Sequence, residues 1–184
     1  MNRSSRNLPP LPGTSGTTGA FSMVTATMLL LSILMQMGVR PPWQMQFPEL
    51  PTAPITVGGE PLVVDVAIEM DARVRGLGYR PGLQDGTGML FIDDTASIQG
   101  FWMKGMRFCL DIIWIDGDSV VGAAQNACPD PAGTADADRA SFASPGPVRY
   151  VVEVPGGWME QHGIEAGAPV TGILEATERF DTAP

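Results

Sequence analysis

Charged and aromatic side chains interrupt several apolar runs of this chain, and these are the residues that could do chemistry. Asp111 lies inside the apolar run LDIIWI (110–115), and Glu153 lies between two valines. A buried carboxylate is costly unless a partner compensates its charge. Trp102 and Lys104 would share one face of a strand, because side chains alternate along it. The candidate ligand-binding residues, with two arginines as counter-charges, are Arg75, Arg80, Trp102, Lys104, Asp111 and Glu153.

These residues fit three classes of function. An aromatic side chain beside fixed charges is typical of a binding module for a small ligand, a glycan or an envelope partner, and we prefer this interpretation. Alternatively, Asp111 and Glu153 could act as the carboxylate pair of a hydrolase if their separation suits glycoside chemistry. A third possibility is a scaffold that acts through protein contacts, with the charges paired only to close one end of the fold.

Other catalytic and metal-binding patterns are missing from the sequence. His162 is the only histidine, and its place at the end of a predicted helix favours a capping role. The chain has no phosphate loop, no GxGxxG motif, and no HExxH or paired CxxC metal spacing. Asp93 and Asp94 are adjacent, so their side chains would point apart and be solvated. We therefore expect no metal and no cofactor, and an enzyme is the less favoured class.

The chain contains two cysteines, Cys109 and Cys128, on either side of a predicted hairpin turn at 116–118. In a regular hairpin Cys109 would face Asn126, two residues from Cys128, and a bulge or frayed end could bring the cysteines together. Outside the membrane such a pair would oxidise, so we expect a disulfide. Two inert buried thiols are the alternative.

An uncharged run near the N-terminus predicts a membrane anchor. Residues 20–39 carry no charge, and a helix of that length spans about 30 Å, the thickness of a bilayer core. Arg3 and Arg6 precede the run and every acidic residue follows it, which places the N-terminus in the cytoplasm. We expect a single-pass protein of the cell membrane that contacts the lipid bilayer through 20–39. A cleaved signal sequence is the alternative, although no small-x-small site follows the run.

The charge balance argues against one class of partner. From Arg40 onward 20 acidic residues stand against 9 basic ones, within a formal net charge of -9 for all 184 residues. An acidic body repels phosphate, so we expect no nucleic-acid partner.

Composition and periodicity predict an α+β fold that is mainly β, a compact barrel-like domain of short strands after the transmembrane helix. Runs such as LDIIWI are apolar on both faces, which favours a sheet that curls toward closure. The predicted strands are 61–68, 89–92, 100–104, 109–115, 119–125, 148–154 and 168–175, with short helices at 70–79 and 158–162. The predicted segments are a disordered N-terminus at 1–19, the anchor at 20–39, a Pro-rich linker at 40–54, the extracytoplasmic domain at 55–176 and a flexible tail at 177–184.

Five blocks of sequence carry a resemblance to a known family. They are ARVRGLGYRPGL (72–83), GMLFI (88–92), FWMK (101–104), LDIIWID (110–116) and YVVEVPGGW (150–158). In order and spacing they resemble the bacterial and archaeal family called domain of unknown function 192, from Pro61 to Ile173. The resemblance implies a β-rich α+β domain, often preceded by a signal or membrane anchor, and no established activity. Gly105 and Met106 stand where the family usually has an Asn-Thr pair, so the polar contact of that pair is missing here.

Overall fold

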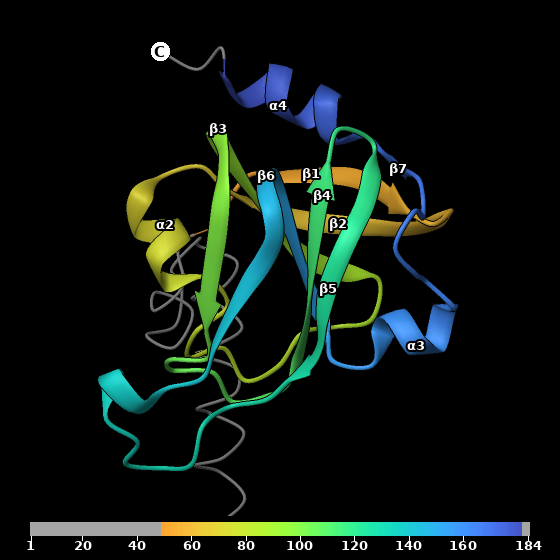
Figure 1. The fold of residues 1–184 in the computed structure, drawn as a ribbon. Coiled ribbons are helices and arrows are strands. Elements are labelled where there is room, and N and C mark those ends of the chain that lie inside the picture. The colour runs from red at the N-terminus through yellow and green to blue at the C-terminus, as the bar shows by residue number, and fades with distance from the viewer. Residues whose placement is uncertain (1–48, 182–184) are drawn as a thin grey trace, which may run out of the picture. The chain divides into compact units, whose positions relative to one another are not determined.

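A curled sheet of seven strands runs through residues 49–181, the part of the chain that the computed structural model describes (Figure 1). The fold is mainly β with a few short helices, as predicted. The strands are β1 Thr52–Val57, β2 Glu60–Ala67, β3 Thr87–Trp102, β4 Leu110–Asp116, β5 Ser119–Ala127, β6 Ser141–Pro155 and β7 Val170–Thr171. The helices are α2 Met70–Arg75, the single 3-10 turn η1 Asp136–Asp138, α3 Trp158–His162 and α4 Ile173–Asp181.

The strand order is β5-β4-β6-β3-β2-β1-β7, which makes β6 and β3 the centre of the sheet. All neighbours are antiparallel except β2 and β3, which are parallel and are joined through α2. Backbone hydrogen bonds also connect β7 and the residues just before it, at one edge of the sheet, with β5 and the turn before it at the other edge. The amide of Val120 in β5 donates to Ala168 O at 2.9 Å, and the amide of Val170 in β7 donates to Asp118 O at 2.7 Å. The sheet is therefore curled as a half-barrel whose outer strands meet near β7.

Strand β4 is buried on both faces of the sheet, as its largely apolar sequence predicts. Ile113 and Ile115 join one core cluster, which also contains residues of α3 and α4. Ile112 and Trp114 join a second cluster on the opposite face, beneath α2. The two clusters explain why an open, one-sided sheet does not fit this sequence.

Two strands are longer than expected. Strand β3 is continuous where two separate strands at 89–92 and 100–104 were predicted, and β6 begins at Ser141, ahead of the predicted strand at 148–154. Apart from Ile98 and Phe142, the residues of these added segments are polar or small and mostly exposed, so they lack the alternation that marks a half-buried strand. Register shifts between Ile92 and Ser97 and between Ile98 and Gly100 bend the ladder without ending it.

The C-terminal prediction was wrong in two respects. A strand at 168–175 was expected, but β7 has only two residues and α4 follows it through Asp181, into the predicted flexible tail at 177–184. Gly172 ends the strand with φ +86°, and a Cβ there would lie 2.6 Å from Pro54 O. Ile173 and Ala176 are buried one helical turn apart, which holds α4 on the sheet.

The domain also begins earlier than the predicted Ile55. Strand β1 starts at Thr52, so the last residues of the predicted linker are strand. Pro54 is tolerated because β7 pairs only with Thr56 and Val57, so among the described residues no strand pairs with Pro54 on that side of β1. The predicted anchor at 20–39 lies outside the described residues. Within 49–181, no helix is long and apolar enough to cross a membrane.

The predicted disulfide between Cys109 and Cys128 is present, and the hairpin of β4 and β5 shows why. Ile115 pairs with Val120 but Trp114 pairs with Gly122, and a second shift separates Ile112 from Leu110. Each shift adds one residue to β5. Together they move the register by two residues and bring Cys128 opposite Cys109.

Removing the disulfide should destabilise the domain. Replacing both cysteines by serine opens a cross-link across 19 positions, which should lower the free energy of unfolding by about 3 kcal/mol because the unfolded chain gains freedom. Urea unfolding of the wild type and of the double variant, each with and without reductant, measures this. A wild-type curve that reductant does not move would contradict the expectation.

Candidate functional site

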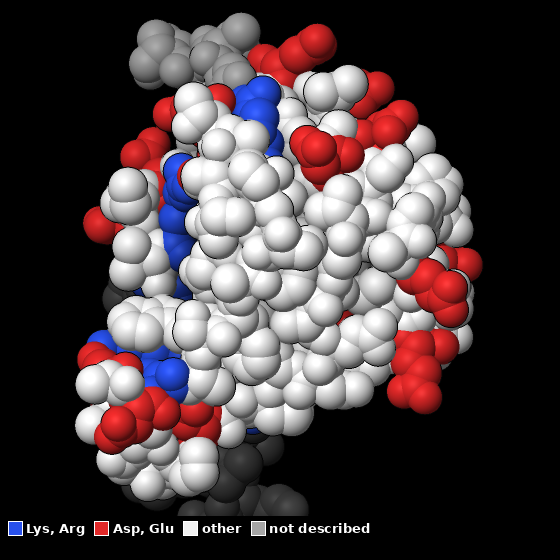
Figure 2. All heavy atoms as spheres, viewed as in Figure 1, with Lys and Arg blue, Asp and Glu red and all other residues white. Residues whose placement is uncertain are grey.

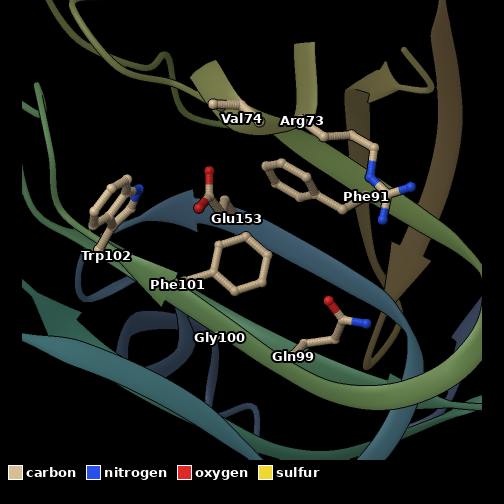
Figure 3. A pocket seen from close by; sticks show the side chains of 9 residues that line it. Arg73, Val74, Phe91, Gln99, Gly100, Phe101, Trp102 and Glu153 are labelled. Atoms are coloured by element: carbon tan, nitrogen blue, oxygen red, sulfur yellow. The ribbon is translucent and has the colours of Figure 1, made fainter. Parts of the chain in front are cut away.

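A pocket of about 290 Å³ opens between α2, β3 and β6 (Figure 3). Strand β3 contributes residues from both of its halves, because its bulges turn the second half relative to the first. The residues that line the pocket are Arg73, Val74, Gly76, Phe91, Gln99, Gly100, Phe101, Trp102 and Glu153.

Glu153 points into this pocket from the centre of the sheet (Figure 3). It stands in register with Met89 of β3 and Ile112 of β4, and only 6% of its surface is exposed. Its Oε2 atom forms no hydrogen bond within residues 49–181. Burial raises the pKa of Glu153 from 4.5 to about 8, against a smaller lowering by the positive charge of Arg80. At neutral pH this carboxyl is largely protonated, and no described residue partners it.

Three aromatic side chains surround the carboxyl group. The rings of Phe91 and Phe101 meet edge to face, with their centroids 5.0 Å apart. Trp102, at the end of β3, leaves 46% of its surface exposed at the pocket. The C-terminal end of α2 covers the opposite side, where a Cβ on Gly76 would lie 3.8 Å from Glu153 Oε2. Gly76 has φ +52°, a conformation that glycine adopts without strain.

The basic residues around the pocket each pair with an acidic residue other than Glu153. Arg73 of α2 forms an ion pair with Asp93 of β3, and Lys104 forms one with Asp136. These side chains are partly exposed, so the pairs fix geometry more than they add stability.

Two further contacts involve Arg80 and Lys104, basic residues that do not line the pocket. Arg80 lies 2.7 Å from Asp65 of β2. The ammonium of Lys104 also lies over the ring of Trp102, 5.0 Å from its centroid. The predicted neighbourhood of Trp102 and Lys104 is therefore present.

Asp111 has a different environment from the one predicted. It is fully buried, and its carboxylate accepts three backbone N–H bonds, from Asn126 at 2.7 Å, from Gly157 at 3.0 Å and from Met159 at 2.8 Å. The prediction that an arginine pairs with Asp111 is therefore wrong. These bonds hold the β5 bulge, where Asn126 has φ +51°, and the first turn of α3.

The hypothesis of an Asp111–Glu153 catalytic pair is also wrong. Asp111 stands opposite Val154, whereas Glu153 stands opposite Ile112. Paired residues project to the same side of a sheet and neighbours along a strand to opposite sides. Asp111 therefore projects with Val154 toward one core cluster and Glu153 toward the other, so the sheet separates the two carboxylates.

The remaining predicted residues lie apart from the pocket lining. Arg75 is exposed at the end of α2. His162 has contacts beyond the predicted capping role. Its Nδ1 lies 3.3 Å from Glu60 Oε2, and its ring packs against the ring of Trp158. No cluster of His, Cys, Asp or Glu in the described part of the chain could hold a metal ion.

Of the nine residues that line the pocket, only Trp102 and Glu153 were predicted from the sequence. Phe91 and Phe101 were placed in predicted strands without a functional role, and Arg73 was not proposed. The alternation of Phe101 with Met103 gives no sign of a pocket, because the pocket exists only where bent β3 meets α2. The sequence Arg-Val-Arg at 73–75 was the one pattern that could have pointed to this wall of the pocket, because it places charged side chains in a short helix.

Comparison with known proteins identifies the family of the domain. Residues 53–172 match the model of DUF192, a family described as uncharacterized ACR, over more than half of the chain. The chain belongs to the DUF192 family. The DUF192 segment contains the whole pocket and both cysteines. No curated protein matches the chain.

Two solved structures share this DUF192 fold. A proposed transcription regulator from Sinorhizobium meliloti 1021 is 25% identical, with a TM-score of 0.62 over 69% of this chain and 98% of that one. A protein of unknown function from Novosphingobium aromaticivorans DSM 12444 is 30% identical, with a TM-score of 0.58 over 66% of this chain and 86% of that one.

Replacing Asp111 should unfold the domain more readily. In Asp111→Asn an amide group takes the place of one carboxylate oxygen and leaves a buried backbone N–H without its acceptor, so the free energy of unfolding should fall by about 3 kcal/mol. Urea unfolding measures the loss. Asp116→Asn at the exposed end of the same strand is the control and should change little. Equal stability of the two variants would refute the structural role of Asp111.

Glu153 should make the stability of the domain depend on pH. Its folded pKa lies above its ordinary value, so its stabilising contribution is complete below about pH 4.5 and is lost as the pH rises to about 8. Glu153→Gln should remove this decline and be more stable than the wild type above pH 8, by an amount on the order of a few kcal/mol. Thermal unfolding from pH 4 to pH 9 tests this, with the exposed Glu165→Gln as control. Parallel curves for wild type and Glu153→Gln would contradict the expectation.

Proposed function

We propose that this chain is a membrane-anchored, extracytoplasmic binding module that takes a small ligand in the pocket at Glu153. The observation that carries the proposal is Trp102, a large aromatic side chain left 46% exposed beside a buried carboxyl that has no partner in the described part of the chain. Apolar walls with a few convergent polar groups are typical of small-molecule sites.

The surroundings of Trp102 support a ligand that extends beyond the pocket. A second hollow of about 380 Å³ shares Gly100, Phe101 and Trp102 with the first. Its far side is formed by the loop that carries η1, with Asp136 and Arg139. A ligand that stacks on Trp102 could therefore contact both hollows.

The proposed location rests on two features of the chain. Residues 20–39 are uncharged and long enough to span a bilayer as a helix. The Cys109–Cys128 disulfide is of the kind that persists in oxidising compartments outside the cytoplasm. Both features agree with a domain held outside the membrane.

Two other functions receive less support. The hydrolase hypothesis loses its carboxylate pair, because Asp111 and Glu153 project to opposite faces of the sheet. The Sinorhizobium meliloti protein is described as a proposed transcription regulator, and a regulator that acts by binding DNA must attract phosphate. From Glu49 onward the chain carries 20 acidic and 8 basic residues, and acidic groups are scattered around the face drawn in Figure 2. Such a surface repels phosphate, so we expect no nucleic-acid partner.

A thermal-shift screen of the full-length protein tests the binding function. Compounds that raise the melting temperature of the wild type should lose this effect in Trp102→Ala, because the aromatic surface at the pocket is removed. Ile98→Ala is the matched control, since Ile98 is 59% exposed on the same strand and does not line the pocket. A screen without any stabilising compound, or stabilisation that persists in Trp102→Ala, would contradict the proposal.

A further inference from the structure

We infer that the pocket selects an organic amine, whose ammonium group is held by Glu153 at the base and by the faces of the surrounding aromatic rings. This inference rests on the proposed binding function and names the chemical class of its ligand.

The first argument is the unmet bonding capacity of Glu153. Its side chain is more than nine-tenths buried, it points into the pocket, and its Oε2 has no hydrogen-bond donor among the described residues. A buried polar atom without a partner is costly. A ligand N–H group placed in the pocket would remove that cost, and a charged N–H group would also compensate the carboxylate.

The second argument is the chemistry of the walls. The faces of aromatic rings carry partial negative charge and attract cations. Phe91, Phe101 and Trp102 all line the pocket. The protein already uses one of these rings in this way, because the ammonium of Lys104 lies 5.0 Å from the centroid of Trp102.

The third argument is the state of the basic side chains near the pocket. Arg73 from α2 pairs with Asp93, and Lys104 after β3 pairs with Asp136. Glu153 is therefore the acidic residue of the pocket lining that no ion pair within residues 49–181 satisfies.

The remaining described neighbours of Glu153 offer no free positive charge. Arg80, from the turn after α2, pairs with Asp65. The residues opposite Glu153 are Met89 on β3 and Ile112 on β4, and neither titrates. An anionic ligand would find each of these basic side chains already engaged, and the acidic domain as a whole attracts cations.

Binding of an amine by this site has a defined proton balance. Below pH 8 Glu153 is mostly protonated and the amine arrives as ammonium. Formation of the ion pair moves the carboxyl proton to solvent, and no covalent bond of the ligand changes. The affinity should therefore rise by about tenfold per pH unit between pH 5 and pH 7 and level off above pH 8.

The experiment is calorimetric titration of the full-length protein with matched pairs of probes. Benzylamine and cyclohexylamine are the cations, benzyl alcohol and cyclohexanol are their neutral analogues, and benzoate is the anion. At pH 7 each amine should bind at least about tenfold more tightly than its alcohol. Titrations in two buffers of different ionisation enthalpy should show nearly one proton released per amine bound.

Variants assign the effect to the pocket. Glu153→Gln should abolish both the preference for amines and the proton release, whereas Glu165→Gln should keep both. Trp102→Ala should weaken every probe that binds, and Ile98→Ala should not.

The outcomes separate this inference from the proposed function. Amines that do not bind, that bind no better than their alcohols, or whose affinity survives Glu153→Gln would overturn the inference. If an alcohol or benzoate then binds in a manner that depends on Trp102, the binding function stands without the amine. A preference for benzoate that weakens above pH 8 would show instead that the protonated carboxyl donates to an anion.

Discussion

The arrangement around the β4–β5 hairpin depends on one buried carboxylate, Asp111, and on the three backbone amides that donate to it. The amide of Asn126 belongs to the bulge of β5, and those of Gly157 and Met159 belong to the start of α3. One side chain thus fixes the register of the hairpin and the position of the helix that closes one core cluster. The bulge that it holds is also one of the two that bring Cys109 and Cys128 together.

Glu153 is the counterpart of Asp111 on the opposite face of the same sheet. Both carboxyl groups are buried in the middle of the domain, but backbone amides satisfy the first and no described group donates to the second. The physical difference lies in what covers each face. The N-terminal amides of α3 lie over Asp111, whereas the C-terminal end of α2 and a set of aromatic rings lie over Glu153. The unsatisfied group is the one that adjoins a pocket, which is why function is assigned to it.

Part of this structure could be predicted from sequence because local patterns determine it. Alternating and doubly apolar runs predicted β2 and β4, and the Asp116–Asp118 turn predicted the hairpin. Strand β3 could not be predicted as one element, because its middle residues are polar and are held only by pairing with β6.

The candidate site was predictable only in its components. Trp102 was identified as an aromatic side chain on the same strand face as Lys104, and Glu153 as a carboxylate between two valines of a strand. The partners of Asp111 could not be predicted, since any residue offers a backbone amide. The separation of Asp111 from Glu153 follows from the register between β4 and β6, which no local pattern reveals.

The most direct test of this account is the titration of Glu153 itself. Carbon-13 NMR of side-chain-labelled glutamate would follow its carboxyl carbon from pH 3 to pH 10, with the signal assigned by its loss in Glu153→Gln. The account predicts a titration midpoint at about 8, because the carboxyl is buried without a partner. A midpoint near the ordinary value of 4.5 would contradict it, since the group would then be solvated or already paired.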